Sequence, residues 1–526
     1  NRRRESAATE EELPAGHDVL GDLQRPPGRI IGRFEPEECG GVHGREATGT
    51  STLGPPAGSA ILVAMPLHRR SDLDDINAPI FSRLAREVPK YTFPRHETDR
   101  RVAFELVESE LSLDGSASQN LATFCQTWES DEVHRLMNLS ISKNLIDKDE
   151  YPQSAEIERR CVQMLADLWH APDSHDPVGT SAIGSSEACM LAGMAMLRRW
   201  KARQQAAGRP TDSPNLVCGP VQVVWDKFCR YWDIEQREIP MTPGHLCMEP
   251  DTMLGQIDEN TIGVVPTLGV TYTGVYEPVA DLALALDDLQ SRTGLDIDLH
   301  IDAASGGFTA PFCAPDLPWD FRIPRVKSIS ASGHKFGLAP LGAGWVLWRD
   351  ASELPAELIF HVSYLGGDMP TFQLNFSRPA GQIISQYYEF VRLGHAGYAG
   401  IHGAAYANGQ HLADALVRMG RFEMVHNADP TTGIPAVTWK LPDGDDSKWS
   451  LLELADRLRT RGWQVPAYPL TGEMSTQLVQ RALIRQEIDR DRIDVLIQDI
   501  TDAVDFLDRH PPSSVQTQEE SGSFSH

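Results

Sequence analysis

The sequence predicts an α/β protein built around a mostly parallel sheet. From about Ser154 onward, helical and strand patterns alternate along the chain, which is typical of sheets whose strands are joined by helices. Residues 295–302 alternate apolar and polar side chains, and this spacing of two predicts a strand that ends at Asp302. Because ligands of parallel sheets bind at the carboxyl ends of the strands, Asp302 stands where a site is expected.

The remaining elements are predicted from local patterns, in chain order. A long helix is expected over 187–205, because its apolar residues recur at helical spacing. Short apolar runs predict strands over 215–225, 261–265 and 344–348. A last helix is expected over 491–509, where an apolar stripe at helical spacing is followed by two prolines that end it.

Composition excludes several classes of protein. At roughly 150 residues per domain, 526 residues suggest three or four compact units. The net charge of −26 argues against nucleic acid and against anionic membrane surfaces, which both require basic patches. No run approaches the roughly 18 apolar residues of a membrane span, so no stable membrane insertion is expected. The eight cysteines show no metal-ligand spacing, and we expect them to be reduced and structural in a cytoplasmic protein without a bound metal.

The two ends of the chain differ from its middle. Residues 1–64 are rich in Gly, Pro, Glu and Arg, and such a composition predicts a disordered N-terminal extension, with the functional polypeptide beginning near Met65. The opening arginines are followed by no apolar region, so they are not a secretory signal. Residues 513–526 form a polar tail that we expect to be mobile. The tail holds no basic amphipathic stretch with a Trp, so calmodulin is not expected as a partner.

Three segments carry chemically informative residues. Ser185 and Ser186 open the helix predicted over 187–205, where hydroxyls and free backbone N–H groups can bind a phosphate, although serines there often serve as helix caps. Asp302 is followed by small residues that let a flat ring approach, although a turn carboxylate is the commoner case. Lys335 lies in a small, apolar, glycine-containing segment, where a desolvated amine becomes a nucleophile; a surface lysine is the alternative.

In combination these segments meet the requirements of pyridoxal 5'-phosphate. The serines would bind the phosphate. Asp302 would keep the pyridine nitrogen protonated, which makes the ring an electron sink. Lys335 would hold the cofactor covalently, and the neighbouring His334 would reach the phosphate or cover the ring.

Longer motifs then point to one family. They are Leu113-Asp114-Gly115, Gln119-Asn120-Leu121-Ala122-Thr123-Phe124, Gly184-Ser185-Ser186-Glu187-Ala188, Thr271-Tyr272-Thr273-Gly274, residues 300–307 and residues 332–337. From about Asp72 to its end, the chain resembles the group II pyridoxal-dependent decarboxylases and, among them, the bacterial glutamate decarboxylases. The resemblance implies fold type I of the pyridoxal-dependent transferase-like enzymes. It implies an N-terminal segment over 65–117, a large cofactor domain over 118–405 and a smaller C-terminal α/β domain over 406–512.

The resemblance also implies residue roles around the cofactor. Lys335 resembles the lysine that bonds the cofactor, and Asp302 the partner of the pyridine nitrogen. Other positions are similar to phosphate binders, to contacts of the ring and its hydroxyl, and to the residue over the ring face. The phosphate binders are Ser185, Ser186, His334 and Ser332. The contacts of the ring and its hydroxyl are Thr271 and Ala304, and the residue over the ring face is Gln222.

Substrate choice is implied for a second set of residues. Thr123, Phe124, Asn144 and Asp147 match a segment that receives the distal carboxylate of glutamate at a dimer interface, and Arg481 matches an arginine for the other carboxylate. An Asp that faces a carboxylate requires a shared proton, which favours binding at acid pH. The alternatives are loop hydrogen bonds for Thr123 and Asn144, a helix N-cap for Asp147 and a surface ion pair for Arg481.

The activity implied by the resemblance is decarboxylation of L-glutamate to 4-aminobutanoate and CO2, which consumes a proton and suits acid resistance or glutamate catabolism. A homo-oligomer is expected, with the dimer as its smallest active unit and a hexamer as a larger form. His526 resembles a terminal histidine that closes the site above mildly acidic pH; a terminal histidine without function is the alternative. The alternative activities are a decarboxylase for aspartate or a sulfinate analogue, and a non-catalytic binding protein. No G-x-S-x-G segment supports a serine hydrolase.

Overall fold

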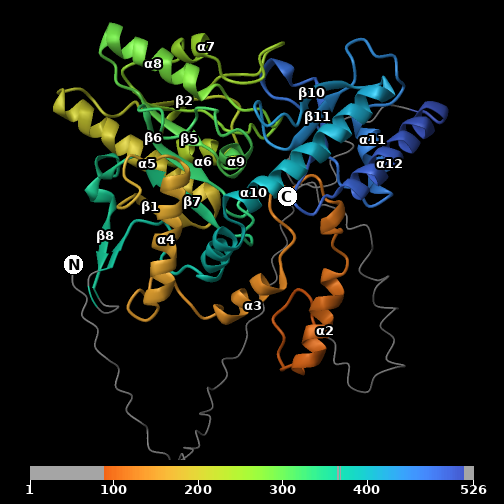
Figure 1. The fold of residues 1–526 in the computed structure, drawn as a ribbon, viewed down its shortest axis with the longest axis horizontal. Helices are drawn as coiled ribbons and strands as arrows, with labels where there is room; N and C mark the ends of the chain where they lie inside the picture. Colours follow the sequence, from red (N-terminus) through yellow and green to blue (C-terminus); the bar gives the residue numbers. More distant parts are fainter. Residues whose placement is uncertain (1–87, 364–366, 368, 514–526) are drawn as a thin grey trace, which may run out of the picture. The chain divides into compact units, whose positions relative to one another are not determined.

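The computed structural model describes residues 88–363, 367 and 369–513 (Figure 1). Two compact units divide the chain at residues 98 and 99, and the elements below belong to the second. Several predictions concern residues outside these ranges. They are the extension over 1–64, the start near Met65, and the tail after residue 513, which includes His526.

The larger of the sheets has seven strands, both parallel and antiparallel, in the order β1-β7-β6-β5-β4-β2-β3. The strands from β6 to β3 in that order pair in parallel, whereas β7 runs antiparallel to both β1 and β6. The predicted, mostly parallel α/β sheet is thereby confirmed. The bounds are β1 Val178–Ala182, β2 Asn215–Cys218, β3 Glu235–Glu238, β4 Thr261–Val265, β5 Asp298–Asp302, β6 Val326–Ala331 and β7 Gly344–Trp348.

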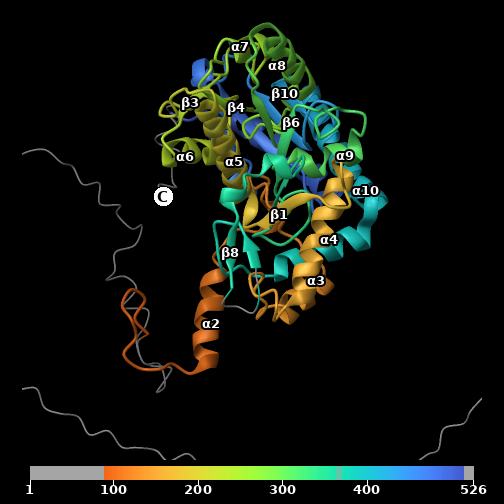
Figure 2. The ribbon, with the colours of Figure 1, turned by 90° about the vertical axis from the view of Figure 1, so that its left-hand side faces the viewer.

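Helices cover both faces of this sheet. In β7, Val346 and Trp348 pack with α5 (Gly184–Ala206), while Trp345 and Leu347 face the cluster that contains α4 (Pro152–Leu168). Figure 2 shows α4 and α5 on opposite sides of β1. The inner strands β2, β4, β5 and β7 are therefore buried on both faces, as in other α/β proteins, whereas the edge strand β3 is partly exposed. The other helices of this layer are α6 Val223–Tyr231, α7 Pro250–Leu254, α8 Val279–Thr293 and α9 Ala310–Cys313.

A second, four-stranded antiparallel sheet follows in the order β10-β11-β13-β12. Its helices include α10, whose path changes direction at Gly394 (φ 53°, ψ −170°). The boundary expected between residues 405 and 406 falls inside α10 and stays a prediction. The bounds are α10 Gly381–Met419, β10 Glu423–Asn427, β11 Ala436–Lys440, α11 Leu451–Arg459, β12 Ala467–Pro469, β13 Leu478–Leu483 and α12 Arg490–Arg509.

The remaining elements are short or peripheral. Helix α2 has no buried residue. The helices are α2 Arg100–Leu111 and α3 Asp131–Leu139, and a two-stranded sheet pairs β8 Phe360–Val362 with β9 Met369–Thr371. No helix in the described ranges is long and apolar enough to cross a membrane, and no group of three metal-ligating side chains occurs in them. The seven cysteines described there are all free.

Most predicted elements agree with the structure. The helices expected over 187–205 and 491–509 correspond to α5 and α12, and the strands over 261–265 and 344–348 match β4 and β7. The strand expected over 215–225 is wrong in its second half. It ends at Cys218, because the Gly219-Pro220 pair interrupts the ladder, and α6 begins at Val223.

Strand β5 departs from its prediction in a more informative way. It spans only Asp298–Asp302, and its polar residues are as buried as its apolar ones. Each buried polar side chain has a partner. Asp298 pairs with Arg199 at 2.7 Å, and His300 hydrogen-bonds through Nδ1 to the Ser328 hydroxyl at 2.8 Å. The alternation therefore marks a strand with a polar, internally paired face rather than a solvent-facing one.

Candidate active site

The predicted cofactor residues lie at the carboxyl ends of neighbouring strands. Asp302 ends β5, and the segment that contains Ser332 and Lys335 follows β6. The turn after β1 leads directly into Gly184 and α5. The backbone N–H of Ser332 donates to the carbonyl of Ala304 at 3.1 Å, which ties the two segments after β5 and β6 together. The sheet thus brings side chains from distant parts of the sequence to one edge.

Asp302 is held by two N–H donors. Its side chain is buried, with the residue 3% exposed. Oδ1 accepts from the Ala304 N–H at 3.2 Å, and Oδ2 accepts from the indole N–H of Trp225 at 2.9 Å. The first contact is the turn that a strand-end Asp commonly makes. The second is a buried contact to another element, and a carboxylate held in this way suits a cationic partner.

Lys335 carries an amine whose charge is disfavoured. Its Nζ lies 4.9 Å from the ring centroid of Phe124. Burial lowers the pKa of the Lys335 ammonium below its usual value, and the nearby Asp302 carboxylate opposes part of that shift. A lowered pKa increases the fraction of neutral amine, which is the nucleophilic form. The structure therefore does not support an ordinary surface lysine at this position.

The start of α5 forms a cradle without side-chain caps. The N-cap residue is Ile183, and no side chain caps the helix there, so Ser185 and Ser186 are not caps. The Ser332 hydroxyl donates to the Ser185 hydroxyl at 2.7 Å. Free N–H groups at a helix N-terminus, together with these hydroxyls, are suited to bind a phosphate.

His334 lies against this cradle. Its ring packs on Gly184, where an added Cβ would lie 2.9 Å from the His334 Cε1. The Nδ1 atom is buried without a hydrogen-bond partner. Burial, with a smaller effect of Lys335, lowers the pKa of His334 to about 4, so the imidazole is neutral near pH 7. A buried polar atom without a partner is unusual and indicates a group that a ligand satisfies.

Arg481, like Lys335, lies against the ring of Phe124. Its Cζ lies 4.4 Å from the Phe124 centroid, and it donates to the carbonyls of Ala122, at 3.2 Å, and of Thr271. The residue is 5% exposed, its Nε has no partner, and burial lowers the pKa of its guanidinium. Within the described residues it forms no ion pair, so the alternative of a surface ion pair is wrong.

Three other predicted site residues have local partners. The Asn144 amide Nδ2 donates to Ser377 Oγ at 3.3 Å, and its Oδ1 accepts from the Arg378 N–H at 2.9 Å. Asp147 is not an N-cap, because α4 begins at Pro152 with Tyr151 as its cap. Gln222 caps α6, since its Oε1 accepts from the N–H two residues later at 2.7 Å. No contact within the described part of the chain joins these three side chains to Lys335.

Thr123 also has local partners. Its hydroxyl accepts from the Cys125 N–H at 3.2 Å, and its carbonyl accepts from Arg485 at 2.6 Å. The loop hydrogen bonding considered for Thr123 is therefore present. For Asn144, likewise, the loop alternative describes its contacts within one chain.

Two residues at the site were missed by sequence reasoning. Trp225 holds Asp302, but the strand predicted over 215–225 concealed its place on α6. Glu277 is 2% exposed and accepts from the N–H groups of Met248 and Thr267, both at 2.7 Å. A lone carboxylate inside an apolar stretch was a signal for Glu277, whereas nothing local marked Trp225.

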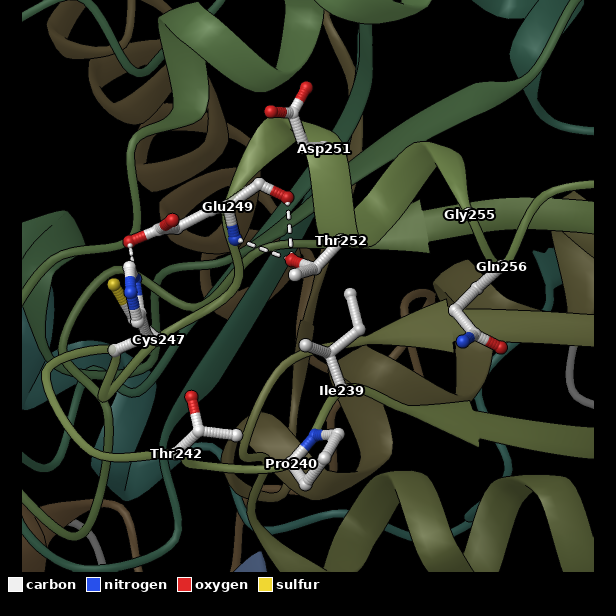
Figure 3. Close-up of a pocket in the computed structure, with 10 residues that line it drawn as sticks. Ile239, Pro240, Thr242, Cys247, Glu249, Asp251, Thr252, Gly255 and Gln256 are labelled. Carbon is white, nitrogen blue, oxygen red and sulfur yellow. Dashed lines mark hydrogen bonds and ion pairs between the residues drawn. The ribbon is translucent and has the colours of Figure 1, made fainter.

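A cavity of ≈ 370 Å³ lies elsewhere, along residues 239–256 (Figure 3). Glu249 points into it and is paired with His245 at 2.7 Å, while Thr252 hydrogen-bonds the Glu249 backbone. None of the predicted site residues lines this cavity. None of the motifs identified in the sequence falls along it, so the strand-edge residues remain the stronger candidate site.

Comparisons with known proteins agree with this site. The family profile described as "Pyridoxal-dependent decarboxylase conserved domain" matches residues 94–442. The chain is 55% identical over 465 residues to a glutamate decarboxylase of Aliivibrio fischeri, which covers 88% of this chain and 100% of that protein. It is 47% identical over 446 residues to glutamate decarboxylase beta of Listeria innocua, which covers 84% and 96%.

Solved structures show the same relationship. A glutamate decarboxylase of Lactobacillus brevis superimposes with a TM-score of 0.78 at 43% identity, over 81% of this chain and 97% of that chain. A sphingosine-1-phosphate lyase of Burkholderia pseudomallei, 21% identical, shares the fold with a TM-score of 0.68 over 80% and 93%. The expected fold type I is confirmed.

The residues present fit pyridoxal phosphate. An uncapped helix start with hydroxyls faces the unpartnered Nδ1 of His334, a doubly held carboxylate ends β5, and an amine with a lowered pKa lies nearby. These are a phosphate site, a partner for a pyridine nitrogen and a lysine able to bond a carbonyl carbon. With a profile that spans most of the chain, relatives aligned over nearly their whole length and this set of side chains, the protein belongs to the pyridoxal-dependent decarboxylase family.

Proposed function

We propose that the protein decarboxylates L-glutamate to 4-aminobutanoate and CO2 with pyridoxal phosphate as its cofactor. The observation that carries the proposal is the pair of cationic groups on the ring of Phe124. Arg481 lies 4.4 Å and the Lys335 amine 4.9 Å from its centroid, and among the described residues Arg481 forms no ion pair and its Nε has no hydrogen-bond partner. A buried, uncompensated guanidinium is costly, so a carboxylate of the substrate is its natural partner.

The chain's own residues would hold the cofactor at three points. Ser185, Ser186 and the N-terminus of α5 would bind the phosphate, with His334 and Ser332 beside them. Asp302 would hold a proton on the pyridine nitrogen. Thr271 and Ala304 would border the ring, and Gln222 would approach its face by leaving its capping contact on α6.

When bound, pyridoxal phosphate supplies an electron sink for the bonding pair that remains when CO2 leaves. Lys335 supplies the amine that bonds the cofactor. Arg481 orients a carboxylate of the substrate, which fixes the bond that breaks relative to the ring. Glutamate carries one net negative charge and 4-aminobutanoate none, so each turnover consumes one proton. That balance suits acid resistance, which we include in the proposal alongside glutamate catabolism.

The distal carboxylate of glutamate is assigned to Thr123, Phe124, Asn144 and Asp147. Among the described residues, no hydrogen bond or ion pair joins Asn144 or Asp147 to Lys335, and this supports a site completed by the same residues of a second copy. We therefore propose a homo-oligomer whose smallest active unit is the dimer, with a hexamer as the larger form to test. A cytoplasmic location belongs to the same proposal.

The proposal is tested with the purified protein and its cofactor. The visible absorbance of the bound cofactor is recorded from acid to neutral pH, and CO2 release is then followed with glutamate, aspartate and a sulfinate analogue in parallel. Gas from glutamate alone is expected. Gas from aspartate or the sulfinate would establish the alternative substrate, and a visible band without gas from any of them would indicate a binding protein.

The terminal histidine needs its own experiment. We propose that His526 closes the site above mildly acidic pH, because imidazole titrates in that range. A chain that ends at residue 512 is expected to keep its activity toward neutral pH. An unchanged pH profile would show that the tail has no such role.

A further inference from the structure

Trp225 is not among the residues assigned to the cofactor, but it contacts one of them, Asp302. The indole N–H donates to Oδ2 of Asp302 at 2.9 Å, and both residues are buried. Oδ1 of the same carboxylate accepts from the Ala304 N–H at 3.2 Å, and the buried Cys189 thiol also hydrogen-bonds to Asp302. The backbone donor holds one oxygen through the longer bond and the indole holds the other through the shorter one, so the plane of the carboxylate depends on both.

The indole itself is held on two sides. Trp225 is 0% exposed in the first turn of α6. Its ring meets Phe228 edge to face, with centroids 5.8 Å apart, and the His300 ring at 5.4 Å. Phe228 in turn fills the space over Gly193 of α5, where a Cβ would lie 2.5 Å from its Cζ. Close packing of this kind leaves the indole a single orientation.

His300 is a fixed, uncharged wall behind the indole. Its Nδ1 pairs with the Ser328 hydroxyl at 2.8 Å and its Nε2 with the Ser330 hydroxyl at 3.2 Å. Burial lowers the pKa of His300 to about 3, so the ring stays neutral and does not compete for the carboxylate. The Ser330 hydroxyl also contacts Cys189 Sγ at 3.3 Å. Every polar group of this wall is paired, and the Trp225 N–H is left to serve Asp302.

We infer that Trp225 is a positioning residue, whose indole N–H aims the Asp302 carboxylate at the pyridine nitrogen and thereby keeps that nitrogen protonated. The inference rests on the proposed function, because it requires the cofactor in the place described above. A carboxylate that turns about its bond to Cβ loses the alignment that a charge-assisted hydrogen bond needs. Without alignment, the nitrogen releases its proton more readily and the ring withdraws electrons less strongly.

The test removes only the donor. Trp225→Phe keeps an aromatic ring without the N–H, and replacement of Trp225 by 3-benzothienylalanine keeps the bicyclic shape with sulfur in place of the N–H. The second variant decides the question if the first does not fold. The matched control is Trp449→Phe, because Trp449 is 2% exposed and its indole donates to Asp508 at 2.9 Å, away from the cofactor residues.

Two quantities are measured on each protein: the affinity of the cofactor-free protein for pyridoxal phosphate, and the pH titration of the visible band of the loaded protein. We expect both Trp225 variants to bind the cofactor about tenfold more weakly, as for the loss of a hydrogen bond to a charged group. We also expect the titration of the band to move to higher pH, because a ring without its positive charge lets the Lys335 nitrogen bonded to the cofactor keep its proton to higher pH. Both quantities should be unchanged in Trp449→Phe.

The outcomes separate the inference from the proposed function. A weaker affinity with an unmoved titration would overturn the inference, because packing alone would explain it, and so would values equal to the control. If the unchanged protein binds the cofactor but releases no CO2 from glutamate, the proposed function fails while the titration still decides the role of Trp225. If the unchanged protein binds no cofactor, both fail.

Discussion

Gly184 offers a direct test of the proposed phosphate cradle. The residue begins α5 with a φ of +78°, in the left-handed region that favours glycine. An added Cβ would lie 2.9 Å from the His334 Cε1, closer than atoms in ordinary contact. Gly184→Ala therefore has two effects: a backbone cost, and a displacement of either the imidazole or the start of the helix.

The two effects are separated by a glycine just beyond the other end of the same helix. Gly208 has a φ of +67°, and a Cβ there would meet nothing within 4 Å. A left-handed alanine costs about 1–2 kcal/mol, so both variants are expected to lose about that much free energy of unfolding. Only Gly184→Ala is expected to bind pyridoxal phosphate more weakly. The loss is about tenfold, or about 1.4 kcal/mol, as for one displaced phosphate hydrogen bond.

Both variants are purified without cofactor, unfolded with denaturant to obtain the free energy of unfolding, and titrated with pyridoxal phosphate. The prediction concerns the difference between them. Equal cofactor affinities in Gly184→Ala and Gly208→Ala, at equal losses of stability, would refute the cradle at the start of α5. A larger affinity loss in Gly208→Ala would refute it as well.

Three further predictions follow from the same contacts. Lys335→Ala should remove the visible band and reduce CO2 release to background while the denaturation midpoint is kept; a persistent band would contradict it. Arg481→Lys keeps the positive charge but loses the planar guanidinium that can bind a carboxylate through two hydrogen bonds, so the KM for glutamate should rise about tenfold. An unchanged KM would show that Arg481 has only a structural role. Burial raises the pKa of Glu277 to about 7. Its contribution to stability is therefore present below the usual value of 4.5 and lost as pH rises to about 7. Between pH 4.5 and about 7, the free energy of unfolding should therefore fall by up to about 3 kcal/mol in the unchanged protein and by less in Glu277→Gln, as measured by melting curves. The same pH dependence in both proteins would contradict the prediction.

The cofactor site was predictable because its parts are local. A helix start with serines, a strand-end Asp and a lysine among small residues each lie within a few residues of sequence, and parallel topology assembles them at one edge. The strands β4 and β7 were predictable for a similar reason, since a fully buried strand is a short apolar run. What these segments share is that their signal does not depend on distant neighbours.

The partners of these residues could not be predicted in the same way. Trp225 and Asp302 are 77 residues apart, and their contact depends on how α6 packs on the sheet. The error over 215–225 has the same origin, because the apolar residues of α6 continue the run of β2 and only the Gly219-Pro220 break separates them. The alternation over 295–302 predicted a strand but not the partners of its polar side chains, which come from α5 and β6.

The unpartnered atoms at the site bear on the proposal as a whole. Buried polar atoms without a hydrogen bond are rare in folded proteins, because each costs about 1–3 kcal/mol. Two of them, His334 Nδ1 and Arg481 Nε, belong to the neighbourhood of Lys335, whereas the His300 ring behind Asp302 has both nitrogens paired. Unpartnered buried atoms also occur elsewhere in the described residues, as at Trp348 and Trp439, but the two at the site lie where the proposal places a phosphate and a substrate carboxylate. The free protein therefore carries a cost that an anionic cofactor and a dicarboxylic substrate would relieve, and binding both should raise its stability more than binding the cofactor alone.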